Sequence, residues 1–105
     1  MIPLENQEQF ENLLNPANKN PEQVVVYFTA SWCGACTRLN HSEIQASNTK
    51  IVWYKCDIDQ NKYTLGYCGL KQIPSFAIIK NSKFLGKFTS PDTATVIETL
   101  NEAFN

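Results

Sequence analysis

The stretch that decides the fold is residues 24–36, which read Val24-Val-Val-Tyr-Phe-Thr-Ala-Ser-Trp-Cys-Gly-Ala-Cys36. The part up to Ala30 is a run of β-branched and aromatic side chains. Because its apolar character is continuous and does not alternate, it predicts a central strand covered on both faces. A helix is expected directly afterwards, from Cys36 to Ala46. Two cysteines, Cys33 and Cys36, therefore lie where a buried strand ends and a helix begins.

The rest of the chain alternates between strand and helix patterns before it ends in a hairpin and a helix. The expected order is β-α-β-α-β-α-β-β-α, which indicates an α/β domain with a mixed sheet and helices on both faces. Residues 1–105 are interpreted as a single domain. The other predicted elements are a short edge strand at 2–4, helices at 5–15 and 61–68, strands at 51–57, 75–80 and 83–89, and a helix opening at Ser90-Pro91 with an apolar stripe of Val96, Ile97, Leu100 and Phe104.

Composition restricts the class of function. The chain has 105 residues, nine basic against ten acidic, so no strong positive field exists to hold a nucleic acid. The N-terminus has neither a basic start nor an apolar stretch, and no apolar run approaches the ~20 residues that span a bilayer. We therefore expect a cytoplasmic protein in a reducing setting, with no membrane contact. Four cysteines are too few for a disulfide scaffold.

The spacing of Cys33 and Cys36 favours reversible disulfide chemistry. Three residues apart on a first helical turn, their Cβ atoms should lie roughly 5–6 Å apart, and a small adjustment closes a bridge. Cys33, at the N-terminal end, should have a depressed thiol pKa and act as the nucleophile. Cys36, one turn further, should be the resolving thiol. A zinc site would need a second cysteine pair, which the chain does not offer, so no metal is expected.

Several separated motifs together resemble the thioredoxin family, in the family's order and across the whole chain. They are Trp32-Cys-Gly-Ala-Cys36 after its strand, Asp57-Ile-Asp59, Ile73-Pro74-Ser75 and the hairpin from Phe76 to Phe88. The resemblance implies a thioredoxin fold, with a central mixed β-sheet of four to five strands flanked by four helices. It also implies a monomeric protein-disulfide reductase without a bound cofactor. Electrons would come from a thioredoxin reductase or another dithiol donor.

The resemblance further implies a shallow apolar surface that receives the substrate. Its residues would be Trp32, Gly34, Ala35, Ile73 and Pro74, with Pro74 preceded by a cis peptide bond. The alternative interpretation of Trp32 and Ile73, as ordinary core or turn residues, stays open. Two other functions also stay open: a disulfide isomerase or oxidase, and a thioredoxin-like binding module in which the cysteines matter little.

Some residues depart from the family pattern. Tyr27 stands where most thioredoxins carry a buried aspartate, so an obvious base for Cys36 is missing and Lys55 loses its usual partner. We expect slower resolution of the mixed disulfide as a result. Ala35 replaces the usual proline between the cysteines, which predicts a somewhat more oxidising couple.

Three further side chains are interpreted mainly as structural. His41 stands where the family's second helix usually has a kinking proline. On a continuous helix it would lie roughly 100° round from Cys36, so a partly exposed surface position is expected. Cys56, within a strand, and Cys68, at the end of a short helix, are interpreted as packed, inert thiols. Regulatory oxidation or dimer formation through Cys68 remains an alternative.

Overall fold

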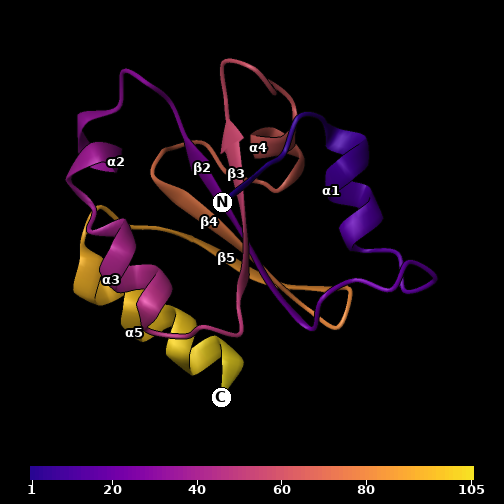
Figure 1. Cartoon of the computed structure of the whole chain (residues 1–105). Coiled ribbons are helices and arrows are strands. Elements are labelled where there is room, and N and C mark those ends of the chain that lie inside the picture. The colour runs from indigo at the N-terminus through magenta and orange to yellow at the C-terminus, as the bar shows by residue number, and fades with distance from the viewer.

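The computed structural model describes residues 1–105 and is built around a five-stranded mixed sheet in the order β1-β3-β2-β4-β5 (Figure 1). The strands are β1 (Ile2–Pro3), β2 (Gln23–Thr29), β3 (Val52–Asp57), β4 (Ser75–Lys80) and β5 (Lys83–Thr89). The first three run parallel, while β4 is antiparallel to both β2 and β5. The predicted mixed sheet is confirmed.

Strand β2 lies at the centre of the sheet, and its alternate side chains enter two separate cores. Val25 and Tyr27 belong to one cluster of buried residues, and Val24, Val26 and Phe28 belong to the other. All five side chains are buried. The continuous apolar run therefore fills both faces of the sheet, as the sequence pattern predicted.

Helices cover the two faces unequally. Helices α1 (Gln7–Leu13) and α4 (Thr64–Tyr67) lie on one face; α2 (Gly34–Arg38), α3 (His41–Ala46) and α5 (Thr93–Phe104) lie on the other (Figure 1). The Asn6 side chain caps α1 by accepting the Gln9 N–H at 2.8 Å. None of the five helices has the length and apolar character that a membrane span requires.

The expected helix from Cys36 to Ala46 is wrong, because two helices stand in its place and the total is five, not four. Helix α2 ends at Arg38, and Leu39 is extended. The Asn40 side chain then accepts the Glu43 N–H at 3.1 Å and caps α3. Asparagine followed three residues later by glutamate is a helix-start signal, and here it acts inside the stretch that was expected to form one helix.

The start of the last helix also differs from the prediction. The expected signal was Ser90 followed by Pro91, but α5 begins two residues later and is capped by Asp92. One carboxylate oxygen of Asp92 accepts both the N–H and the hydroxyl of Thr95, at 2.9 and 2.6 Å. Ser90 instead accepts the Asp92 N–H at 3.2 Å, so it shapes the turn before the cap.

The hairpin and the loop before it follow the sequence closely. Asn81 and Ser82 both have positive φ angles, 52° and 63°, which is the twist that a two-residue hairpin turn requires. The Ile73–Pro74 peptide bond is cis, as the family resemblance implied. Ser75 anchors the start of β4 through its hydroxyl, which donates to the Gln72 carbonyl and lies 2.6 Å from the Thr89 hydroxyl.

Candidate active site

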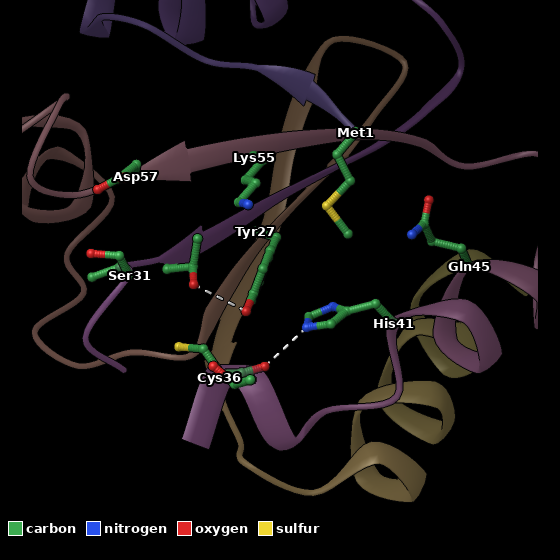
Figure 2. A pocket seen from close by; sticks show the side chains of 11 residues that line it. Met1, Tyr27, Ser31, Cys36, His41, Gln45, Lys55 and Asp57 are labelled. Atoms are coloured by element: carbon green, nitrogen blue, oxygen red, sulfur yellow. Dashed lines mark hydrogen bonds between the residues drawn. The ribbon is translucent and has the colours of Figure 1, made fainter. Parts of the chain in front are cut away.

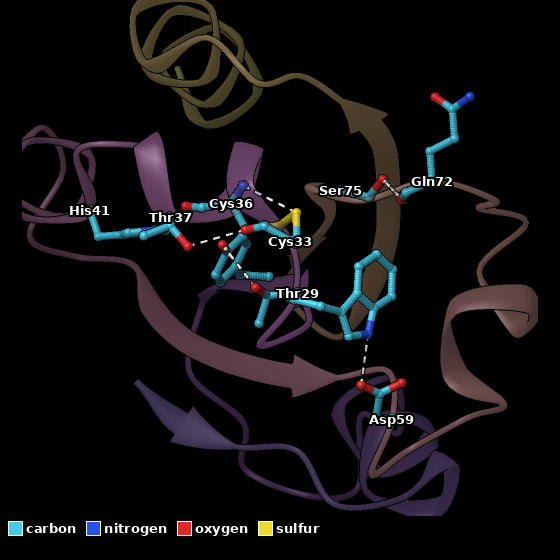
Figure 3. The surroundings of a disulfide bond; sticks show 10 residues. Thr29, Cys33, Cys36, Thr37, His41, Asp59, Gln72 and Ser75 are labelled. Atoms are coloured by element: carbon cyan, nitrogen blue, oxygen red, sulfur yellow. Dashed lines mark hydrogen bonds between the residues drawn. A yellow bond between two sulfur atoms is a disulfide. The ribbon is translucent and has the colours of Figure 1, made fainter.

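Cys33 and Cys36 form a disulfide at the point where β2 has ended and α2 begins (Figure 3). Their Cα atoms are 5.3 Å apart. Cys33 is the N-cap residue of α2, and its Sγ accepts the backbone N–H of Cys36 at 3.1 Å. The same backbone group can stabilise a thiolate on Cys33 in the reduced protein. The geometry thus places a hydrogen-bond donor on the sulfur that the sequence predicts to be the nucleophile.

Both cysteines are buried, with 6% of Cys33 and 2% of Cys36 exposed to solvent. Trp32, beside them in the chain, is 66% exposed, and its indole N–H donates to Asp59 at 2.9 Å (Figure 3). Asp59 belongs to the Asp57-Ile-Asp59 motif, but no role for it followed from the sequence pattern alone. The contact ties the exposed indole, which precedes Cys33 in the chain, to the segment that follows β3.

The residues expected to receive substrate do not all expose their side chains. Gly34 is exposed, while Ala35 and Ile73 are half-buried. Both of these pack against the core cluster that contains the two cysteines. Pro74, by contrast, is fully buried. Any contribution of Pro74 to substrate contact would therefore come from its backbone, with its ring serving the core.

A cavity of about 500 Å³ opens to solvent behind Cys36 (Figure 2). Trp32 does not line it. The residues around it come from β2 and the loop after it, from β3, α2 and α3, and from the N-terminus, and its position was not predicted from the sequence. The lining residues are Met1, Tyr27, Thr29, Ala30, Ser31, Cys36, Thr37, His41, Gln45, Lys55 and Asp57.

Tyr27 forms one wall of this cavity. Its ring stacks on Phe76, with ring centroids 5.4 Å apart, and its hydroxyl donates to the Thr29 hydroxyl at 3.2 Å. Burial raises the pKa of Tyr27 above its usual value, and the hydrogen bond to Thr29 only partly opposes this. Lys55 is the cross-strand neighbour of Tyr27 on β3. The phenol is therefore neutral at physiological pH and supplies no general base to Cys36.

His41 lies closer to the active cysteines than expected. The prediction of a partly exposed position is confirmed, because the side chain is half-buried. However, its ring Nε2 lies 2.9 Å from the Cys36 carbonyl oxygen (Figure 2). The break between α2 and α3 allows this contact, which is with the main chain of Cys36 and not with its sulfur.

The two cysteines outside the disulfide, Cys56 and Cys68, have surroundings unlike those of Cys33 and Cys36. Cys56 lies in β3 and Cys68 ends α4, as predicted, and both are buried, free thiols in an apolar cluster. Burial raises the pKa of each thiol to about 12. Cys68 and Asp57 add to the shift at Cys56, whereas Lys87 slightly opposes the shift at Cys68. Such thiols are poor nucleophiles at neutral pH.

A disulfide between helix-start cysteines, held at the end of a central strand of this sheet, defines a thiol–disulfide oxidoreductase. A family model for thioredoxin matches residues 2–102. The chain belongs to the thioredoxin family, and within it to the protein-disulfide reductases.

Individual relatives agree with the family assignment. Thioredoxin from Geodia cydonium is 31% identical over 87 residues, which cover 81% of this chain and 80% of that one. The TPR repeat-containing thioredoxin TDX of Arabidopsis thaliana is 24% identical over 98 residues, or 91% of this chain, but this chain spans only 26% of its length. The structure of Fasciola hepatica thioredoxin superimposes with a TM-score of 0.83 at 24% identity, covering 98% of this chain and 99% of that one. That likeness supports the fold.

Proposed function

We propose that the protein reduces disulfide bonds in other proteins with Cys33 as the nucleophile and Cys36 as the resolving thiol. The observation that carries this assignment is the asymmetry of the pair. The Sγ of Cys33 accepts a backbone N–H and caps a helix, which favours a thiolate there. Cys36 lies inside the helix and is the more buried of the two.

The proposed reaction has two displacement steps. The Cys33 thiolate attacks one sulfur of the substrate disulfide, forming a mixed disulfide and releasing the first substrate thiolate. Cys36 then loses its proton to solvent and attacks the Sγ of Cys33, which releases the second substrate thiolate. The substrate has gained two electrons, and the protein is left with the Cys33–Cys36 disulfide that the structure contains.

The substrate surface that we propose surrounds the disulfide on the side of Trp32. It consists of the exposed Trp32 indole, Gly34, and the half-buried side chains of Ala35 and Ile73. Pro74 shapes the loop beneath it. A small apolar area next to the reactive sulfur suits many unfolded or extended disulfide-bearing segments. It needs no strong charge on the partner, which agrees with the formal net charge of -1.

For the rest of the cycle we propose a monomer in the cytoplasm that takes electrons from a thioredoxin reductase or another dithiol donor. No bound cofactor takes part, because thiol–disulfide exchange moves both electrons between sulfur atoms. The two free thiols, Cys56 and Cys68, support a reducing compartment.

The test is turnover of a protein disulfide, measured once with NADPH and a thioredoxin reductase and once with glutathione as the donor. We expect turnover with the reductase and none with Cys33→Ser Cys36→Ser under the same conditions. Turnover with glutathione alone would assign a glutaredoxin-like role. If the double variant instead supports full cellular function, the protein acts as a binding module and the proposal is wrong.

A further inference from the structure

The break between α2 and α3 leaves the Cys36 carbonyl without its normal helical partner. In a continuous helix that oxygen would accept the N–H of Asn40, four residues on. Here the Asn40 N–H donates instead to the Thr93 hydroxyl on α5, at 3.0 Å. Only the Leu39 N–H, at 3.3 Å, reaches the Cys36 oxygen from the backbone. The resolving cysteine thus sits in a helix whose last turn is incomplete.

The His41 side chain supplies the missing donor. Its Nε2 lies 2.9 Å from the Cys36 oxygen, and a carbonyl oxygen can only accept a hydrogen bond. The hydrogen must therefore be on Nε2, and the ring connects the start of α3 directly to the main chain of the resolving cysteine. This contact is visible in Figure 2, beside the cavity that Cys36 and His41 both line.

The ring of His41 is itself held in place from the sheet. It packs against the ring of Tyr27, with centroids 5.0 Å apart and planes tilted by 53°. Tyr27 is only 3% exposed and is fixed in turn by Phe76 and Thr29. The donor therefore approaches Cys36 from a rigid support and not from a freely rotating surface side chain.

We propose that His41 is a positioning residue for the resolving step, holding the Cys36 backbone where its sulfur can close on Cys33. Helix α2 has only five residues, too few to be stable by its own hydrogen bonds. An external donor on its last turn limits the movement of Cys36, and a restricted nucleophile attacks faster than a loosely held one. This inference rests on the proposed roles of Cys33 and Cys36.

The test compares His41→Phe with His41→Gln. Phenylalanine keeps a ring against Tyr27 but cannot donate, whereas glutamine can still donate an amide N–H to the Cys36 oxygen. Gln45→Ala is the matched control, because Gln45 lines the same cavity from α3. Unfolding midpoints of all the reduced variants show whether each one is folded.

The first measurement uses a nitroaromatic disulfide that releases one coloured thiolate when Cys33 attacks and a second when Cys36 resolves the adduct. Cys33→Ser reports any background from the other thiols. We expect His41→Phe to slow the second release roughly three- to tenfold, the effect of one hydrogen bond, with the first release unchanged. His41→Gln and Gln45→Ala should stay within about twofold of the parent protein. Equal slowing of both releases, no slowing at all, or a glutamine variant as slow as the phenylalanine variant overturns the proposal.

The second measurement does not depend on reduction of protein substrates. Equilibration with glutathione gives the constant for closing the Cys33–Cys36 disulfide from the mixed disulfide of Cys33. We expect His41→Phe to lower that constant by a similar three- to tenfold factor, and His41→Gln to leave it nearly unchanged. If the parent protein fails to reduce any protein disulfide yet shows this pattern, the proposed function is wrong and the role of His41 stands. An unchanged constant in His41→Phe contradicts the role of His41 alone.

Discussion

The protein has two redox-active cysteines, Cys33 and Cys36, and two free cysteines, Cys56 and Cys68. All four are buried to similar degrees, but the two pairs have unlike surroundings. Cys33 and Cys68 are each 6% exposed. The sulfur of Cys33 accepts a backbone N–H at the start of a helix, whereas Cys68 ends a helix inside an apolar cluster, where burial raises its pKa to about 12. The comparison shows that burial alone does not make a thiol inert. What matters is whether the fold directs a donor at the sulfur.

The largest expected effect comes from replacing one redox-active cysteine, and we compare it with replacing one free cysteine. Cys33→Ser should lower turnover of a protein disulfide by at least roughly 10³-fold, because the nucleophile of the first step is gone and no mixed disulfide forms for Cys36 to resolve. Cys68→Ala should leave turnover within about twofold, since its thiol stays protonated and takes no part. Turnover is measured with a saturating electron donor. A large loss in Cys68→Ala would break the comparison and favour the alternative of regulation through Cys68.

The next effect concerns the two sulfurs within the active pair. Cys36 faces a cavity whose wall is Tyr27, and that buried phenol supplies no base. Tyr27→Asp should accelerate the release of substrate from the mixed disulfide by about tenfold or more, because a general base is restored. Tyr27→Phe is the matched control and should leave that rate unchanged. If Tyr27→Asp also leaves it unchanged, the missing carboxylate does not limit resolution.

The smallest effect is on the equilibrium between dithiol and disulfide. Ala35 stands between the active cysteines where proline is usual, so we expect a potential less negative than the thioredoxin value of about -270 mV. Ala35→Pro should lower the potential by up to about 30 mV, equivalent to a tenfold change in the equilibrium constant. Equilibration with glutathione gives the reduction potential of both the parent protein and the Ala35→Pro variant. A parent potential at or below about -270 mV contradicts this interpretation of Ala35.

Much of the fold could be predicted because single strong patterns determine it. The continuous apolar run from Val24 determines β2, and Asn81-Ser82 determines the hairpin turn. One helix was expected from Cys36 to Ala46 although Asn40 and Glu43 carry a capping signal, because that signal falls inside the expected helix and not before it. The start of α5 was misplaced since Asp92 competes with Ser90 as the cap, and the carboxylate accepts two bonds from Thr95.

The site was predictable only in part, for a physical reason. The cysteine spacing indicates redox chemistry because both sulfurs belong to one helical turn. The cavity behind Cys36 and the contact of His41 with the Cys36 carbonyl depend on how α3 packs against β2 and α5, which no local pattern encodes. Likewise, the Trp32–Asp59 bond joins residues 27 positions apart in the chain. Such contacts follow from the tertiary arrangement.

The most direct test of the central claim is the pH dependence of thiol alkylation in the reduced, folded protein, measured residue by residue by mass spectrometry. A thiolate reacts and a thiol does not, so a raised pKa moves the onset of reaction to higher pH. We predict that Cys33 is modified at neutral pH with an apparent pKa below the usual ~8.5. Cys56 and Cys68 should remain unmodified until the pH approaches about 12. Equal modification of Cys33 and Cys68 at neutral pH would contradict the account.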